Sequence, residues 1–165
     1  MSNDAASLFT LHHVGIIVGG IEAAMDAYAT NFGSSFSEFE VNESNSSFSG
    51  SSSNFRLRFG IGHLGMTMIE LIEPLSGTTI YSDFLAQHGP GLYHVGYCVT
   101  DLASASTQLE TRGYRCLMKG TIHKLADFNY YEAPDLACVI EPLQLSIDLS
   151  AFLLKNAKLY TGKST

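Results

Sequence analysis

The chain has 165 residues, of which 45% are hydrophobic and 15% charged, a composition that predicts one soluble globular domain over residues 1–165. Its net charge of −7 at pH 7 argues against a nucleic-acid partner or an anionic membrane surface and favours a small-molecule partner. Because the first residues lack the pattern of a signal peptide and no apolar stretch approaches the roughly 18 residues of a membrane span, we expect a cytoplasmic protein.

The first part of the chain predicts a strand, a helix and a second strand. A polar arm over residues 1–9, which we expect to be mobile, precedes the strand at 11–18. A helix is expected over 21–33, where Ile21, Met25, Tyr28 and Phe32 recur at three- and four-residue spacing and predict one buried face. A strand is expected at 36–41.

Residues 44–54 contain seven serines, and such a composition predicts a flexible loop. The loop would be either a lid over a site or a tolerated surface insertion. The alternation at 55–59 then predicts a strand with Arg56 and Arg58 on one face. That face would look either into a concavity, where it would suit an anionic group, or into solvent.

A further strand is expected from residue 65 to 73, ended by Pro74. Its period of two places Glu70 on the face of Met68 and Ile72, whereas Glu73 points to the other face. A carboxylate on an apolar face is costly to bury unless it is paired or bound to a metal ion.

The second part of the chain repeats the pattern of the first. A linker helix over 79–87, within a linker at 76–91, leads to a strand at 92–99 and a helix over 102–113 that Thr100 or Asp101 can cap. Strands follow at 114–118, 129–132 and 137–146. A last amphipathic helix over 148–160 could cover an open sheet edge or mediate a homodimer.

The repeat is clearest in the first strand of each half. Leu-His-His-Val-Gly-Ile-Ile-Val at 11–18 has the same apolar, His-Val-Gly and closing Val positions as residues 92–99, and each half later carries a Glu in a hydrophobic strand. Fixed self-similarity of this kind predicts two like modules, 11–75 and 92–147. If these pack about a pseudo-two-fold axis, His13, Glu70, His94 and Glu141 converge.

Four imidazole and carboxylate groups without a thiolate suit a divalent ion of Co, Ni, Mn, Zn or Fe. The string Ile-Glu-Pro-Leu, which occurs at 72–75 and again at 140–143, offers the alternative of pairing Glu141 with Glu73. The remaining histidines have no counterpart in the other half and are interpreted as surface, turn or supporting groups. They are His12, His63, His88 and His123.

Other chemistries lack their motifs. There is no Gly-x-Ser-x-Gly elbow, no P-loop and no dinucleotide fingerprint. The three cysteines, Cys98, Cys116 and Cys138, have no Cys-x-x-Cys spacing and are interpreted as reduced core thiols.

These motifs resemble the vicinal oxygen chelate superfamily, the group of glyoxalases, bleomycin-resistance proteins and ring-cleaving dioxygenases. The resemblance covers residues 11–147 and is most specific from Phe84-Leu85 through His88-Gly89-Pro90-Gly91 to residues 92–102. It implies an α+β fold in which paired βαβββ modules form a cupped mixed sheet, a half-barrel, around a metal ion, with the C-terminal helix added.

The resemblance also implies residue roles. His13, His94 and Glu141 match metal ligands of the family, and Glu70 rather than Glu73 matches the fourth ligand of glyoxalases. The motifs are most similar to those of methylmalonyl-CoA epimerases. Segments 44–54 and 123–131 depart from that pattern where the substrate would be contacted, so the substrate stays open.

We therefore expect a glyoxalase- or epimerase-like isomerase or lyase that abstracts a proton next to a carbonyl, on an acyl thioester or a related compound, and stabilises a metal-bound enolate. Glu141 or Glu70 would move the proton. One alternative is an Fe(II) ring-cleaving dioxygenase with His13, His94 and Glu141 as its facial triad. The other is a metal-free small-molecule binding or resistance protein.

Overall fold

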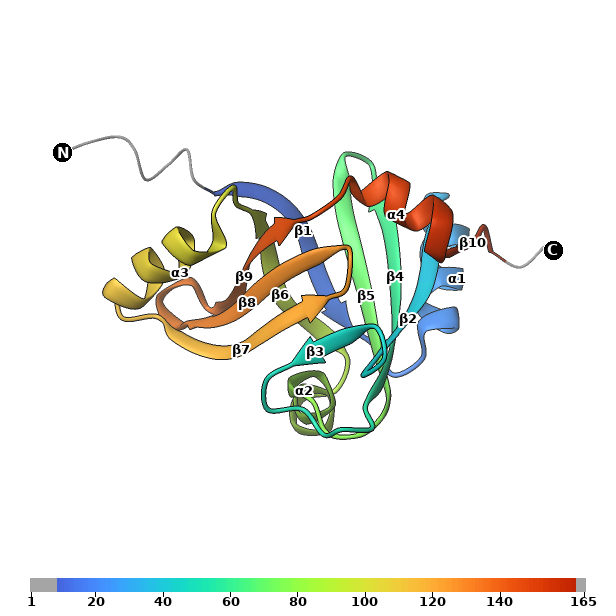
Figure 1. The fold of residues 1–165 in the computed structure, drawn as a ribbon. Coiled ribbons are helices and arrows are strands. Elements are labelled where there is room, and N and C mark those ends of the chain that lie inside the picture. The colour runs from blue at the N-terminus through green and yellow to red at the C-terminus, as the bar shows by residue number, and fades with distance from the viewer. Residues whose placement is uncertain (1–8, 163–165) are drawn as a thin grey trace.

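A computed structural model of the chain describes residues 9–162 and shows an α+β fold built on one curled ten-stranded sheet (Figure 1). The strand order is β10-β2-β4-β5-β1-β6-β9-β8-β7-β3. Apart from its last residue, the predicted mobile arm lies outside the described residues. The elements in chain order are β1 (Thr10–Ile17), α1 (Ile21–Phe32), β2 (Phe36–Asn42), β3 (Ser46–Phe48), β4 (Arg56–Leu64), β5 (Thr67–Ser76), α2 (Ile80–His88), β6 (Gly91–Cys98), α3 (Leu102–Thr111), β7 (Arg115–Ile122), β8 (Ala126–Ala133), the 3₁₀ helix η2 (Pro134–Leu136), β9 (Cys138–Leu145), α4 (Leu149–Asn156) and β10 (Lys158–Tyr160).

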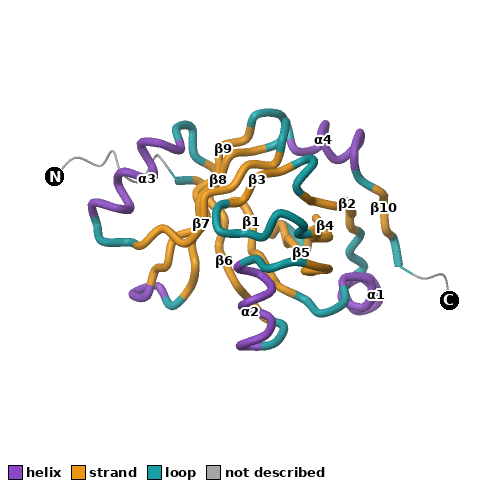
Figure 2. Tube along the Cα trace, turned by 60° about the horizontal axis from the view of Figure 1, so that its bottom comes forward, coloured by secondary structure: helices purple, strands orange, loops and turns teal. Residues whose placement is uncertain are grey.

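The two halves of the chain have the same topology. β1 pairs with β5 in parallel, β6 pairs with β9 in parallel, and β1 and β6 join the halves as an antiparallel pair at the centre of the sheet. Figure 2 shows β1 and β6 in the middle, with α3 and α1 at opposite ends of the molecule. The predicted cupped sheet of paired βαβββ modules is confirmed, and the exact module bounds stay a prediction.

Alternation along the strands separates an outer layer from the core inside the cup. On the outside, Ile69 and Leu71 of β5 pack with Ile21 and Met25 of α1. The predicted stripe of α1 is thus only partly buried, since Phe32 in the last turn is 62% exposed. On the inside, the neighbouring residues of β5 contribute to a large aromatic core that both halves share.

The loop prediction for the Ser-rich segment was wrong for residues 46–48, whereas residues 44–45 and 49–54 are turns or irregular. Ser46–Phe48 forms β3, which pairs antiparallel with β7 and buries Phe48. The serines satisfy the backbone over long distances: Lys119 N donates to Ser49 Oγ (2.8 Å) and Thr78 N donates to Ser52 Oγ (2.9 Å). Because β3 follows β2 directly in the chain, this segment connects the two far ends of the curled sheet (Figure 1).

Two predicted ends are also corrected. β5 continues through Pro74 to Ser76, and its register with β4 shifts there: Arg56 pairs with Ser76 and Leu57 with Pro74, which leaves Leu75 as the extra residue of a bulge in β5. The last helix stops at Asn156, since Ala157 is extended and the chain turns into β10, which pairs with β2. The open edge of β2 is therefore covered by a strand, with α4 beside it.

Two other predictions concern the cysteines and membrane-spanning segments. Cys98, Cys116 and Cys138 are free, as predicted, but they are half-buried and do not belong to the innermost core. None of the helices in the described part of the chain is long and apolar enough to cross a membrane.

Candidate metal centre

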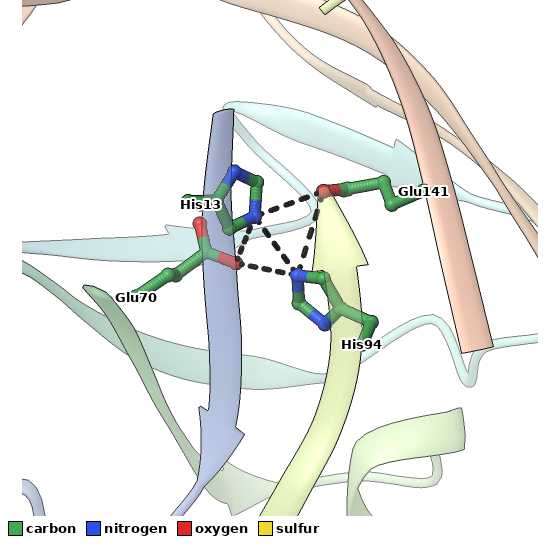
Figure 3. Close-up of side chains that lie close together, drawn as sticks. All are labelled: His13, Glu70, His94 and Glu141. Carbon is green, nitrogen blue, oxygen red and sulfur yellow. Dashed lines mark hydrogen bonds and ion pairs between the residues drawn. The ribbon is translucent and has the colours of Figure 1, made fainter. Parts of the chain in front are cut away.

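The four predicted site residues lie on the four central strands and point toward one another (Figure 3). His13 is on β1, Glu70 on β5, His94 on β6 and Glu141 on β9. One donor atom from each side chain can be chosen so that all four lie within 4.8 Å of one another. Glu73 is on the outer face, where Arg58 donates to its carboxylate (3.4 Å), so the geometry does not place it with the other three.

Strand register explains why the His-Val-Gly motif occurs twice. His13 lies opposite Gly96, and Gly15 lies opposite His94. A Cβ added to Gly15 would be 1.9 Å from His94 Cε1, and one added to Gly96 would be 2.2 Å from His13 Cε1. Each glycine therefore leaves the space that the imidazole of the other strand occupies.

The carboxylates follow the same symmetry. Glu70 pairs in register with Gly15, and Glu141 pairs with Gly96, each in its own half. His13 Nε2 is 3.5 Å from Glu70 Oε2 and 3.1 Å from Glu141 Oε2, while His94 Nε2 is 3.3 Å and 3.5 Å from the same two atoms. The two imidazole Nε2 atoms are 2.9 Å apart.

These residues fit a divalent cation. Neighbouring ligand atoms about 2.1 Å from a shared cation lie about 3 to 3.5 Å apart, and the imidazole nitrogens lie at such distances from each other and from both carboxylate oxygens. The Oε2 atoms of Glu70 and Glu141 are buried and, although each is close to the imidazoles, neither has a hydrogen-bond partner among the described residues. Buried carboxylate oxygens of this kind are costly unless a cation faces them.

Without such an ion, a proton takes the place of the cation. Burial lowers the pKa of His13, but the charge of Glu70 and the close contacts with both carboxylates outweigh burial and raise it to about 10. Burial likewise raises the pKa of Glu70, but the nearby His13 holds it well below its usual range. The imidazolium and the carboxylates therefore stabilise each other in the metal-free protein.

His12 supports His13 from behind. A shift of register between Leu11 and His13 in the pairing of β1 with β6 marks a bulge, and His12 Nδ1 lies 2.9 Å from His13 Nδ1. A hydrogen bond at Nδ1 leaves Nε2 of His13 free to face the other donors. Burial and the adjacent His13 lower the pKa of His12, which favours its neutral form.

The centre forms part of the wall of a cavity inside the cup. His13, Glu70 and Glu141 line this cavity, and most of the other lining side chains are apolar or aromatic. The two arginines of β4 do not reach it: Arg56 pairs with Glu40, and Arg58 pairs with Glu38, Glu22 and Glu73. The arginine face of β4 therefore does not line the cavity inside the cup and lies on the outside of the sheet.

Two tyrosines that line the cavity are absent from the sequence prediction. Tyr81 of α2 and Tyr130 of β8 are completely or almost completely buried. His12, which the sequence analysis placed among surface, turn or supporting groups, also lines the cavity. Period-two alternation in β8 carried a signal for Tyr130, because it places Tyr130 beside Phe128 on the inner face. Nothing local marked Tyr81, which lies next to the predicted apolar positions Ile80, Phe84 and Leu85 of its helix.

Comparison with known proteins gives one family and several similar folds. The family model of the glyoxalase/bleomycin resistance protein/dioxygenase superfamily matches residues 12–131. Among curated proteins none matches the chain.

Solved structures share the fold at low identity. Methylmalonyl-CoA epimerase from Mycobacterium tuberculosis has a TM-score of 0.62 and 23% identity, over 86% of this chain and 91% of that one. A hypothetical protein from Bacillus halodurans has a TM-score of 0.63 and 18% identity, over 82% and 94%. A methylmalonyl-CoA epimerase variant from Streptomyces coelicolor in complex with 2-nitronate-propionyl-CoA has a TM-score of 0.58 and 16% identity, over 85% and 99%.

Proposed function

The chain belongs to the glyoxalase/bleomycin resistance protein/dioxygenase superfamily, and from that premise we propose that it is a metal-dependent isomerase or epimerase of a small carbonyl compound. His13, Glu70, His94 and Glu141 would hold a divalent cation. The observation that carries the proposal is the convergence of four donor groups at the wall of an apolar cavity; two of them are buried carboxylate oxygens that have no hydrogen-bond partner within residues 9–162.

A bound divalent cation would supply positive charge next to the substrate oxygens, where negative charge develops as a neighbouring carbon loses its proton. Glu70 and Glu141 are the bases available for that proton, because both line the cavity. They come from β5 and β9, on opposite sides of the central pair β1 and β6. One carboxylate can therefore take up a proton on one side of the substrate while the other returns a proton on the other side, which inverts the carbon.

The rest of the site would orient the substrate and exclude water. Phe39, Phe59 and Phe128 line the cavity together with aliphatic side chains. An apolar surrounding strengthens the electrostatic interactions between a carboxylate and a reacting group.

The four-residue donor set also favours this reaction over the alternatives. A ring-cleaving dioxygenase would need only the facial triad of His13, His94 and Glu141, which leaves Glu70 without a role. A metal-free binding protein would have no use for two buried carboxylates facing two imidazoles, because burying such groups costs free energy.

The proposal is tested by metal content and proton exchange. Protein purified without chelator is analysed for bound metals, and deuterium uptake from heavy water is followed by NMR for two compounds, methylmalonyl-CoA and hydroxyacetone. Metal-dependent exchange at a carbon next to a carbonyl in either compound supports the isomerase. Oxygen uptake with catechols instead would indicate the dioxygenase, and metal-free protein without exchange would indicate the binding module.

Replacing His94 by Ala should abolish both metal binding and exchange, because it removes one of four donors and leaves a cavity beside the others. His63→Ala, on the exposed outer part of β4, is the matched control and should keep the metal. A His94→Ala protein that retains its metal and its exchange rate would contradict the assignment.

A further inference from the structure

The cavity restricts the charge of the compound that can bind there, and this inference rests on the proposed function. Among the residues that line it, the charged or titratable groups are His12, His13, Glu70 and Glu141 and the hydroxyls of Tyr81 and Tyr130. Among the residues that the structure describes, no lysine or arginine lines the cavity.

The metal centre does not supply an excess of positive charge either. A divalent cation held by Glu70 and Glu141 would have its two charges balanced by the two carboxylates, while neutral imidazoles complete the set. An anionic group on the substrate would thus bring an unbalanced negative charge into an apolar cavity, which is costly. Lys124 lines a neighbouring hollow that shares Phe39 and Ile122 with the cavity but does not line the cavity itself.

One neutral hydrogen-bond donor remains available beside the centre. The Tyr81 hydroxyl donates to the Tyr130 hydroxyl oxygen at 3.2 Å, and the Tyr130 ring lies edge-on to His94 with centroids 5.0 Å apart. Within residues 9–162, the Tyr130 hydroxyl donates no hydrogen bond of its own. A tyrosine hydroxyl is protonated at neutral pH and can therefore act as a donor.

The enclosed space is small, about 40 Å³. A water-sized group needs roughly 10 to 15 Å³ of such space, so the cavity suits a reacting portion of few non-hydrogen atoms.

We propose that the cavity binds a compact, uncharged carbonyl compound, and that Tyr130 donates a hydrogen bond to one of its oxygens. Tyr81 holds the Tyr130 hydroxyl from the other side and so directs its hydrogen toward the ligand. Tyr130 is therefore a determinant of substrate specificity, and the absence of a lysine or arginine from the lining selects against carboxylates.

Hydroxyacetone and glycolate provide a matched pair of probes. Both contain a hydroxymethyl group attached to a carbonyl carbon. The third substituent of that carbon is a methyl group in hydroxyacetone and a negatively charged oxygen in glycolate. Binding to the metal-loaded protein is measured by ligand-observed NMR titration. Hydroxyacetone should bind at least about tenfold more tightly, because glycolate would bury an unpaired charge. Glycolate affinity equal to or greater than that of hydroxyacetone, or no detectable hydroxyacetone binding, overturns the proposal.

The role of Tyr130 is tested with Tyr130→Phe, which should weaken hydroxyacetone binding about fivefold while metal content and melting temperature stay unchanged. Tyr97→Phe is the matched control, because Tyr97 packs against Phe9 outside the cavity. Lys124→Met should also leave hydroxyacetone affinity unchanged. An unaltered affinity in a folded, metal-loaded Tyr130→Phe protein overturns this role. The ratio of the affinities for hydroxyacetone and glycolate is measured on the unmodified protein, so that test does not depend on the folding of a variant.

The outcomes separate this inference from the proposed function. A protein that carries metal and exchanges deuterium but prefers glycolate contradicts the substrate class and leaves the isomerase intact. A metal-loaded protein that shows no exchange but prefers hydroxyacetone contradicts the isomerase and leaves the substrate class standing.

Discussion

At the scale of single residues, the two glycines of the His-Val-Gly motifs are as important to the centre as the histidines. Gly15 leaves room for the imidazole of His94, and Gly96 leaves room for that of His13. In each motif, the histidine supplies a donor atom to the centre, and the glycine leaves room for the imidazole of the paired strand. This reciprocity requires β1 and β6 to pair in one register.

Gly15→Ala should therefore remove metal binding, because the new Cβ would lie 1.9 Å from His94 Cε1 and would displace the imidazole. Gly19→Ala is the control, since a Cβ at Gly19 meets nothing within 4 Å. Metal content by elemental analysis and affinity by calorimetric titration measure the difference. Wild-type affinity in Gly15→Ala would show that the imidazole is not held where the structure places it.

At the scale of elements, β3 holds the two ends of the sheet together. Phe48 stacks on Phe55 with ring centroids 5.0 Å apart and packs edge-on against Phe128 and Tyr81. Two of these partners, Phe128 and Tyr81, line the cavity. The segment that resembles a loop in composition therefore supports the wall of the candidate site.

Phe48→Ala should lower the free energy of unfolding by about 3 kcal/mol or more, as expected for a large buried side chain. Ser47→Ala on the same strand has an exposed side chain and should change it little. Denaturant unfolding followed by circular dichroism compares the two. Equal stability of both variants would indicate that β3 is a dispensable insertion.

The sequence predicts the repeated elements well because like residues at like positions determine like structure. The repeated motif around His13 and His94 predicts the two central strands, and the symmetry of the halves predicts that Glu70 and Glu141 lie close together. The role of these four residues as metal ligands stays a prediction. The features that were missed depend on distant contacts. Ser49 and Ser52 order their segment by bonding to Lys119 and Thr78, and composition does not reveal such partners.

Local irregularity accounts for other differences. His12 reaches the cavity because β1 contains a bulge, whereas a regular strand would turn His12 to the opposite face from His13. Tyr160 could not be placed in a strand from local pattern, because β10 exists only where the edge of β2 receives it. The homodimer stays a prediction, since a single chain does not test it.

At the scale of the whole molecule, the centre links stability to pH. In the metal-free protein, His13 has a pKa of about 10 compared with an ordinary value of 6.5, so its contribution is complete below pH 6.5 and is lost as the pH rises through about 10. The lowered pKa of Glu70 has the opposite sign: its contribution is present above the ordinary value of 4.5 and is lost as the pH falls.

We therefore expect the melting temperature of chelator-treated protein to decrease between about pH 6.5 and about pH 10. In metal-loaded protein this decrease should be reduced or absent, because His13 must already be unprotonated to bind a cation. Thermal unfolding across this range, with and without metal, measures the effect. A chelator-treated protein whose stability is flat over the range would contradict the protonated state of His13.

The aromatic wall of the cavity has a spectroscopic consequence. The chain contains eight tyrosines and no tryptophan, so its intrinsic ultraviolet emission comes from tyrosine alone. Tyr81 and Tyr130 share one hydrogen bond at the cavity wall, and the ring of Tyr130 touches that of His94. Binding of an open-shell ion such as Co, Ni or Mn at the centre would quench the fluorescence of these tyrosines. Tyrosine fluorescence would therefore report metal binding without an attached dye.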